Sequence, residues 1–270
     1  MHQNNLFGNF MIELGAKPHV LHASPFDVYF FDEQKILIHF IDLQKFEQAN
    51  LALHFFTDLT QKTTTIHHKI IHVWEDVWLT NEATVRSRIK SILGYNKKIH
   101  ARQTKVVRLD KLETTNFLNN NHLQKATGAY YKFGLKWQEQ LVAVATFSKA
   151  RTMYDGPIYY RSFELERFAT LAQTNVVGGF SKLVHFFSTN MHAQHIMTYA
   201  DRDWSQGESY SLLGFTLVEE TEPQQFFINK NTLQRTIAHQ QATPENCIKV
   251  WNAGSLKFVL DTRAYETNQA

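Results

Sequence analysis

The chain has 270 residues and a mass of 31.5 kDa, with 43% apolar and 13% aromatic residues. This composition excludes disordered, collagen-like and Pro-rich chains and predicts a folded core. The formal net charge of +3 identifies no partner by itself. The single cysteine, Cys247, excludes an intrachain disulfide and a Cys-based zinc or iron–sulfur site. We find no signal-peptide pattern and no long apolar run, and therefore expect a cytoplasmic protein without a membrane segment or disulfide-linked partner.

The first hundred residues predict a small α/β unit. Residues 27–43 are rich in β-branched and aromatic side chains around a polar turn at 32–34, which predicts a hairpin. Mixed apolar spacing favours a helix over 45–62 and then a strand over 63–74. A helix is predicted from Asn81 to Leu93, where Gly94 provides a stop signal.

A concentrated basic segment follows this unit. Between Arg86 and Arg108 there are eight cations and no acid, so the rest of the chain carries a net charge of −5. Clustered Lys and Arg favour a phosphate-contacting, nucleic-acid-binding surface, although a solvated helix face followed by a linker would give the same pattern. The eight residues are Arg86, Arg88, Lys90, Lys97, Lys98, Arg102, Lys105 and Arg108.

The second part of the chain alternates strands and helices. A strand is predicted from Lys105, a helix start and polar loop over 114–123, and two strands within 130–150. The next predicted elements are a strand over 158–170, a helix over 177–190, a strand over 195–201, a short helix over 208–213 and strands over 215–220 and 224–230. A helix over 231–241 and a hairpin around 252–255 complete the prediction.

The ordered motifs in this part resemble the GNAT acyltransferase superfamily. A strand containing Arg167 is followed by Gly178-Gly179 at a helix start, and Tyr210 lies four residues before Gly214-Phe215. The resemblance implies that the glycine turn holds the pyrophosphate of acyl-CoA and that Tyr210 is the general acid. A phenol with a pKa of about 10 stays protonated at neutral pH and can donate to a thiolate. The implied cofactor-binding residues are Gly178, Gly179, Ser181 and Lys182.

Other details are similar to the phage Mom-type DNA-modification proteins, a divergent GNAT-like group that alters the exocyclic amine of adenine. The matching segments are Asn121-His122, Glu166-Arg167-Phe168, Gly178 to Leu183, Tyr199-Ala200-Asp201 and Tyr210. The resemblance implies that Arg167, Ser181, Asp201 and Tyr210 line the active site, with Asn121 and His122 near the acceptor. In these roles Arg167 would clamp an anionic donor, Ser181 would stabilise an oxyanion, and Asp201 would orient a group or accept a proton.

Each of these residues also has a structural interpretation. Arg167 could pair with Glu164 or Glu166, Asp201 could cap the loop over 202–207, and His122 could belong to a polar loop. Tyr210 could pack in the core beside Leu213 and Phe215. The chain also departs from the GNAT pattern at Phe180, where a small residue is usual, and at Asn175, where Gln or Arg is usual.

The first part resembles phage proteins described as Hef-like homing endonucleases, whose fold is Vsr/restriction-endonuclease-like. The segments IIHVWEDVW, VRSRIKSILG and KIHARQTKV carry this resemblance over about residues 24–108. Asp27 matches the first metal-binding acid and His54 and Lys62 match family positions, but His39 replaces the Glu of active members. Without that carboxylate we expect no bound metal and no cleavage. His67, His68 and His72 are interpreted as strand histidines rather than metal ligands.

The combined prediction is an α/β (α+β) protein with a degenerate restriction-endonuclease-like domain over 1–100, a GNAT-like domain over 101–232 and a tail over 233–270. We expect group transfer from a possible acyl-CoA cofactor to a nucleic-acid base amine, with the first domain binding DNA. A homing or repair endonuclease and a non-enzymatic DNA-binding accessory protein are the alternatives.

Overall fold

The computed structural model describes residues 2–238 and 243–263, and the chain divides into two compact units. Unit 1 comprises Met1–Thr80, Ala200–Gln206 and Glu220–Leu256; unit 2 comprises Asn81–Tyr199, Gly207–Glu219 and Lys257–Ala270. These units differ from the expected division near residue 100 and at residue 233. The boundary at Asn81 lies within helix α4 (Glu75–Ile92), at a residue that is non-helical, with φ −140° and ψ 36°. The whole basic segment therefore belongs to unit 2.

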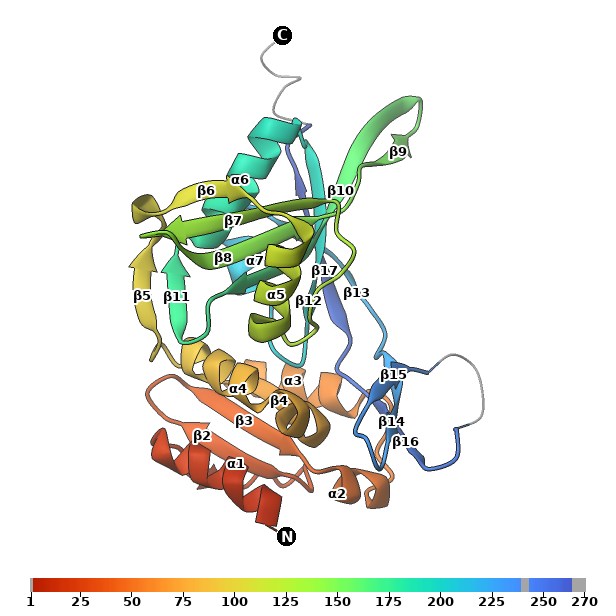
Figure 1. The fold of residues 1–270 in the computed structure, drawn as a ribbon. Helices are drawn as coiled ribbons and strands as arrows, with labels where there is room; N and C mark the ends of the chain where they lie inside the picture. Colours follow the sequence, from red (N-terminus) through yellow and green to blue (C-terminus); the bar gives the residue numbers. More distant parts are fainter. Residues whose placement is uncertain (1, 239–242, 264–270) are drawn as a thin grey trace. The chain divides into compact units, whose positions relative to one another are not determined.

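Unit 1 is built on a four-stranded sheet in the order β1-β2-β3-β4, in which β3 and β4 are parallel and the other pairs antiparallel (Figure 1). Its elements are α1 (His2–Glu13), β1 (Lys17–His19), β2 (Asp27–Phe31), β3 (Ile36–Ile41), α2 (Leu43–Gln48), α3 (Phe55–Thr65), β4 (Lys69–Trp74), β14 (Gln225–Asn229), β15 (Arg235–Ile237) and β16 (Cys247–Trp251). The last three form a separate sheet in the order β15-β14-β16.

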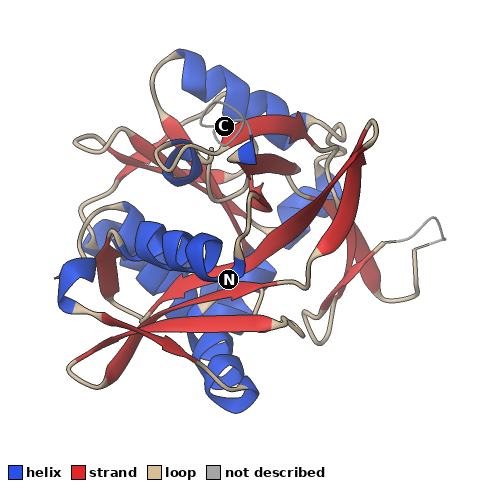
Figure 2. Cartoon of the chain, turned by 90° about the horizontal axis from the view of Figure 1, so that it is seen from above, coloured by secondary structure: helices blue, strands red, loops and turns tan. Residues whose placement is uncertain are grey.

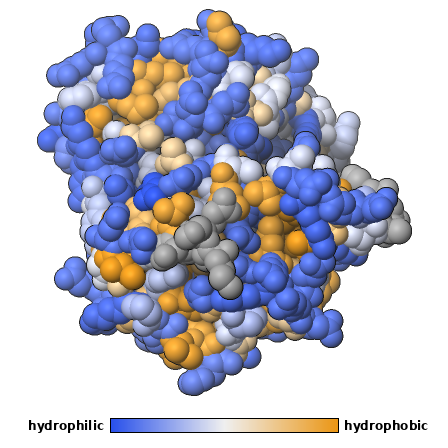
Figure 3. Space-filling model, turned by 60° about the horizontal axis from the view of Figure 1, so that its bottom comes forward, coloured by the Kyte–Doolittle hydropathy of each residue, from blue (hydrophilic) through white to orange (hydrophobic). Residues whose placement is uncertain are grey.

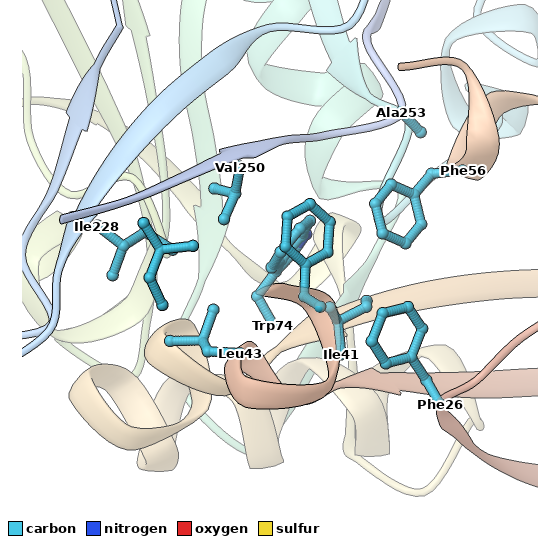
Figure 4. Close-up of a cluster of buried hydrophobic side chains, with 10 residues drawn as sticks. Phe26, Ile41, Leu43, Phe56, Trp74, Ile228, Val250 and Ala253 are labelled. Atoms are coloured by element: carbon cyan, nitrogen blue, oxygen red, sulfur yellow. The ribbon is translucent and has the colours of Figure 1, made fainter. Parts of the chain in front are cut away.

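The strands of unit 1 are covered on both faces. Phe7 of α1 stacks on Phe40 of β3 with ring centroids 4.3 Å apart. Phe56 of α3 lies against Trp74 of β4 at 5.2 Å, within a cluster that also takes side chains from β14 and β16 (Figure 4). All six residues of β3 are buried, as is usual for a strand covered on both faces.

Unit 2 contains the larger sheet, in the order β13-β17-β12-β10-β8-β7-β6, with β9 paired to the start of β10. Its elements include β5 (Lys97–His100), a 3₁₀ turn (Ala101–Gln103), β6 (Lys105–Arg108), α5 (Lys111–Asn121), β7 (Tyr131–Trp137), β8 (Gln140–Phe147), β9 (Arg151–Asp155), β10 (Ile158–Thr170), β11 (Thr174–Val177), α6 (Gly179–Met191), β12 (His195–Asp201), α7 (Glu208–Ser211), β13 (Thr216–Glu220) and β17 (Ser255–Asp261). The parallel strands β5 and β11 form a separate pair.

Helices α5 and α6 cover opposite faces of this sheet, because neighbouring residues of a strand point to opposite sides. Phe147 of β8 stacks on Phe187 of α6 at 3.7 Å, whereas Val144 packs with Phe117 and Leu118 of α5. The abundance of both helices and strands confirms the predicted mixed α/β class (Figure 2). Within the described residues, no helix is long and apolar enough to cross a membrane.

Strand β10 changes its pairing along its length. It runs parallel to β12 only from Ser162 to Glu164, opposite His195 to Met197. Its second half pairs with β8 alone, after a register shift between Leu165 and Arg167. The two parallel strands therefore part beyond Glu164, and the irregularity at Glu166 changes the direction of the side chains that follow.

Two predictions in the first part were wrong. The expected helix over 45–62 is two helices, α2 and α3, because Asn50 has a positive φ of 45° that ends the first. The expected strand from residue 63 begins only at Lys69, since α3 continues to Thr65 and His67 has φ 57°. Of the three histidines expected in this strand, only His72 lies in it.

The C-terminal predictions also need correction. The expected helix over 231–241 is replaced by a turn and by β15, which pairs with β14, and residues 239–241 lie outside the described residues. The turn forms because Asn229 Oδ1 accepts from the backbone N–H groups of Asn231 and Thr232. The expected hairpin around 252–255 is also wrong, because β16 pairs with β14 whereas β17 lies between β12 and β13.

The surface shows two further features. Strand β9 and the start of β10 form a ribbon that extends beyond the rest of its sheet (Figure 1), and Tyr154 and Tyr159 face each other across it, 74% and 71% exposed. On the face drawn in Figure 3, hydrophobic side chains lie in several separate patches among hydrophilic ones. Scattered apolar exposure of this kind is ordinary for a protein surface.

Candidate active site

Tyr210 is held at the point where β10 and β12 part. Its ring contacts Phe180 of α6 edge-on at 5.4 Å and stacks on Phe258 of β17 at 5.2 Å. Its hydroxyl hydrogen-bonds the Thr198 hydroxyl, which in turn donates to the Leu165 carbonyl at 3.0 Å. Thr198 and Leu165 are the first residues beyond the paired part of the two strands. The parted strands and the tyrosine therefore form one connected arrangement.

Burial raises the pKa of Tyr210 above its ordinary value of 10, although the Thr198 hydrogen bond and the charge of Arg88 act in the opposite direction. The phenol thus stays protonated at neutral pH, with a cation near enough to favour the phenolate. Tyr210 also contacts Phe215 at 5.8 Å, as the core-packing interpretation expected. These contacts hold the Tyr210 ring in place, and its hydroxyl can still take part in proton transfer.

Helix α6 begins at the Gly178-Gly179 turn. Gly178 is the N-cap with φ 76°, a conformation that favours glycine, and no side chain caps the helix. A Cβ on Gly179 would come within 2.8 Å of Val176 Cγ1, so close packing on β11 requires a glycine there. The first-turn N–H groups and exposed Ser181 make a positive helix end suited to an anion.

Lys182 has a different environment from the one its sequence position suggested. Its Nζ donates to the Ala101 carbonyl at 2.9 Å and to the Thr104 carbonyl at 2.5 Å. These carbonyls belong to the 3₁₀ turn and the residue that ends it. The ammonium therefore ties α6 to this turn, and a role in binding a cofactor phosphate stays a prediction.

His122 follows α5 and is surrounded by positive charge. Its Nδ1 accepts from the Gln124 N–H at 3.1 Å, so in the neutral ring the proton resides on Nε2. Burial, followed by the charges of Arg88 and Arg167, lowers the pKa of His122 to about 3. At neutral pH the ring is uncharged and can donate from Nε2.

The side chains of Asn121 and Arg167 form hydrogen bonds with backbone groups. Asn121 accepts from the Ala172 N–H at 2.7 Å and donates to the Phe117 carbonyl at 2.7 Å, which joins α5 to the end of β10. Arg167 donates to the Lys125 carbonyl through Nε at 3.1 Å and to the Glu166 carbonyl through Nη1 at 2.6 Å. Burial lowers the pKa of the Arg167 guanidinium, and the nearby Glu166 and Glu164 carboxylates oppose this shift. Both side chains fix the loop that carries His122.

Asp201 belongs to unit 1, whereas the other expected site residues belong to unit 2. Its carboxylate accepts from the Asp203 N–H at 3.0 Å, the geometry of the loop-capping alternative. Asp203 is itself buried and accepts from Trp74 Nε1 and the Ala253 N–H, each at 2.9 Å. Desolvation, followed by the charge of Asp201, raises the pKa of Asp203 to about 8. No sequence signal pointed to this buried carboxyl.

A cavity of about 260 Å³ lies in unit 2 beside His122. It is bounded by the second half of α4, the end of α5, the end of β10, Asn175 of β11 and Ser209 of α7. Ser209 precedes Tyr210, so the cavity adjoins the parted strands. Sequence analysis placed Arg88 only in a basic surface and missed Thr198 and Ser209, since only tertiary contacts bring these residues to the site.

The basic segment is mostly exposed. Arg86 pairs with Glu82 at 2.7 Å and half-buried Arg88 lines the cavity, while Lys97 lies over the Trp137 ring at 4.8 Å. Lys105 of β6 stands directly opposite Lys136 of β7. Like charges at such positions repel. Within the described parts of the chain, five cations of the segment make no ion pair, namely Lys97, Lys98, Arg102, Lys105 and Arg108.

His39 and His72 form a closed buried pair in unit 1. Ser24 Oγ lies 2.7 Å from His39 Nε2, the two Nδ1 atoms are 2.9 Å apart, and His72 Nε2 is 2.9 Å from Thr60 Oγ1. Since Thr60 donates to the Phe56 carbonyl, it accepts from His72. His39 then donates from Nδ1 and accepts from Ser24, so all four ring nitrogens have partners.

The other nuclease-like positions also show no metal-binding arrangement. Asp27 pairs with Lys45 at 2.9 Å, and His54 lies 3.5 Å from Glu222. Lys62 lies in the last turn of α3. Across the described ranges 2–238 and 243–263, His, Cys, Asp and Glu form no group of three suited to a metal.

No protein-family model matches the sequence, and no curated protein gives a significant match. The structure is similar to that of a Bacillus subtilis acetyltransferase in complex with CoA, at 11% identity, over 58% of this chain and 98% of that chain, with a TM-score of 0.38. It is also similar to the ribosomal-protein-S18-alanine N-acetyltransferase of Escherichia coli, at 12% identity, over 59% and 94%, with a TM-score of 0.36. A GNAT family acetyltransferase from Elizabethkingia anophelis with acetyl-CoA bound matches at 11% identity, over 59% and 98%, with a TM-score of 0.35.

At these identities and TM-scores, similarity alone assigns neither a family nor an activity. The nuclease-like domain, the Mom-type relationship and the DNA partner stay predictions. The arrangement of Tyr210, the parted strands and the cavity is the basis for a functional proposal.

Proposed function

We propose that unit 2 transfers an acyl group from acyl-CoA to an amine. The observation that carries this proposal is the position of Tyr210, whose hydroxyl is linked through Thr198 to the point where β10 and β12 part. Its ring also contacts Phe180 in the first turn of α6. A proton donor is thereby fixed between parted parallel strands and an uncapped helix start.

The residues at the start of α6 suit the pyrophosphate of CoA. Gly178, Gly179 and Ser181 would hold it through first-turn N–H groups and a hydroxyl, because no side chain caps this helix end. Bound acyl-CoA supplies a thioester whose C–S bond breaks as a bond forms to the acceptor nitrogen, and the departing thiolate needs a proton. Lys182 would support the same site indirectly, by holding α6 against Ala101 and Thr104.

Tyr210 is the proposed proton donor to that thiolate. Burial keeps the phenol protonated, since it raises the pKa of Tyr210 above 10. Arg88 favours the phenolate that remains after proton transfer. The amine loses its proton to solvent, and solvent returns a proton to Tyr210. His122, which has only an Nε2–H to offer, would orient the acceptor as a hydrogen-bond donor.

A nucleic-acid base amine is the proposed acceptor. Support comes from the exposed cations of β5, β6 and the 3₁₀ turn, which have no ion-pair partner among the described residues. One of them, Lys105, also stands opposite Lys136 of β7. This surface belongs to unit 2, so DNA binding need not depend on the nuclease-like unit. The nuclease alternative gains no support from Asp27, which pairs with Lys45, or from fully buried His39.

The acceptor is tested by expressing the parent protein and Tyr210→Phe separately and digesting cellular DNA to nucleosides. Mass spectrometry should find an acylated nucleoside only with the parent protein. Tyr199→Phe is a matched control, because Tyr199 lies on β12 and is 43% exposed, and it should keep the modification. Absence of a new nucleoside together with absence of acyl-CoA binding would contradict the proposal.

A further inference from the structure

The cavity beside His122 has polar walls. Six of its polar lining residues come from four separate stretches of unit 2: Ser87, Arg88, Asn96, His122, Asn175 and Ser209. A cavity of 260 Å³ is large enough for several waters or a small polar group. The cavity therefore suits a compact, hydrogen-bonding part of a ligand.

The described residues that line this cavity carry one positive charge and no negative charge. Arg88 contributes a guanidinium, and no Asp or Glu lines the cavity among the residues that the structure describes. Burial is the largest cause of the lowered pKa of His122, and the charges of Arg88 and Arg167 lower it further. The same two positive charges attract an anion.

His122 adds a donor without adding a charge. Its Nδ1 is occupied by the Gln124 N–H, and its Nε2–H makes no hydrogen bond within the described part of the chain. Asn175 and Ser209 can each provide a further N–H or O–H donor. Fixed donors beside a guanidinium are the features that bind phosphate and carboxylate oxygens.

We propose that the cavity bounded by Arg88, His122 and Ser209 binds an oxyanion, a phosphate or carboxylate carried by the acceptor. The proposal rests on the proposed function only in assigning the anion to the acceptor. Ser209 lies next to Tyr210, so an anion held here would place the rest of the acceptor beside the parted strands. The site would then select amines that carry a negative group.

Anion binding should be visible at His122. An anion beside the ring favours the imidazolium, so binding must raise the pKa of His122 from its value of about 3. The full-length protein would be examined by NMR of histidine ring signals at pH 7, with His122 assigned from His122→Gln. The probes are inorganic phosphate, acetate, a thymidine dinucleotide and the uncharged methylphosphonate form of that dinucleotide.

We expect saturable shifts of the His122 signal with anionic probes and none with the methylphosphonate. Tighter binding of the charged dinucleotide than of acetate would identify a nucleic-acid phosphate as the source of the anion, and the reverse would identify a carboxylate. Arg88→Gln should weaken the preferred probe about tenfold or more, because it removes a charge-assisted hydrogen bond. Arg86→Gln is the matched control on the same helix, since Arg86 pairs with Glu82 and does not line the cavity.

The proposal is overturned if no anion shifts His122 in the parent protein, a result that requires no variant to fold. An equal response in Arg88→Gln and the parent protein would also overturn it. A failure of acyl transfer would contradict the proposed function but would leave anion binding at His122 unaffected. Acyl transfer without any anion response at His122 would overturn anion binding but would leave the proposed function standing. The two failures are therefore distinguishable.

Discussion

The molecule contains two regions in which a histidine has a strongly lowered pKa, and they differ in what surrounds the ring. In unit 1, desolvation lowers the pKa of His72 to about 3, and desolvation followed by His72 lowers that of His39. In unit 2, desolvation followed by two guanidinium groups lowers the pKa of His122 to about 3. Desolvation is the largest cause of the lowered pKa at all three histidines, and only at His122 do guanidinium groups add to it.

The two regions differ in the hydrogen bonds of their histidine rings and in whether a ligand could reach the ring. Each ring nitrogen of the His39–His72 pair has a partner, and both side chains are fully buried. His122 has one nitrogen occupied and lines a cavity that Arg88 shares. A lowered histidine pKa thus indicates burial in both units. Only in unit 2 does the histidine also line a cavity that could hold a ligand. We infer that the pair is structural and that His122 belongs to a functional site.

Replacement of each histidine by alanine should separate the two regions most strongly. His72→Ala should lower the free energy of unfolding by about 2–4 kcal/mol, because it leaves a cavity and unpaired groups on His39 and Thr60. His122→Ala should lower it by less than about 1 kcal/mol, because that ring is only half-buried. Urea denaturation measures both, and equal losses would contradict the comparison.

Acid should weaken unit 1 through the same pair. The folded state holds His72 neutral to about pH 3, whereas the unfolded chain takes up a proton below its ordinary pKa of 6.5. Stability is therefore complete above pH 6.5 and is lost as the pH falls toward 3. Between pH 7 and pH 5, His72 alone should account for about 2 kcal/mol. Unfolding measured at several pH values should show this slope, with exposed His67→Gln as the control.

Lys182→Met tests whether the lysine in the first turn of α6 binds the cofactor or stabilises the fold. Loss of its bonds to the Ala101 and Thr104 carbonyls should cost about 1–2 kcal/mol of stability. The dissociation constant for acyl-CoA, measured by calorimetry, should change by less than about threefold. A large loss of affinity with unchanged stability would instead assign the ammonium to the cofactor phosphates.

The basic surface should contribute the smallest effect per residue. Replacing Lys98, Arg102 and Lys105 by Gln should reduce the salt dependence of DNA affinity by up to about 3 in log–log slope, roughly 0.9 for each lost phosphate contact. Fluorescence anisotropy at several salt concentrations measures the slope. An unchanged slope would exclude this surface as the contact, and Lys111→Gln on α5 is a control outside the segment.

Local patterns predicted much of unit 2. The bounds of β10 and β12 agree with the predicted strands, and α6 begins at the predicted glycine turn, because alternation and glycine act over a few residues. The sheet that each C-terminal strand joins depends on a partner distant in the sequence. Strand β16 pairs with β14, and β17 lies beside β12 in the larger sheet. No short pattern encodes such a choice.

The site was predictable to a similar extent. Tyr210 lies near the parted strands and His122 lines the cavity, and the active-site roles that their motifs implied stay predictions. The actual partners of Lys182 and Asn121 are backbone carbonyls and an N–H group supplied by folding, which sequence spacing cannot reveal. Arg88 was predicted for surface charge, and only the packing of α4 beside α5 brings it to His122.

The central claim is that Tyr210 supplies a proton during acyl transfer, and release of free CoA thiol tests it most directly. With acetyl-CoA and a DNA acceptor, the parent protein should release thiol at a rate that stays constant from pH 7 to 9, because burial raises the pKa of Tyr210 above 10. Tyr210→Phe should reduce that rate by about 10²–10⁴-fold while acetyl-CoA still binds. A Tyr210→Phe protein as fast as its parent would contradict the account.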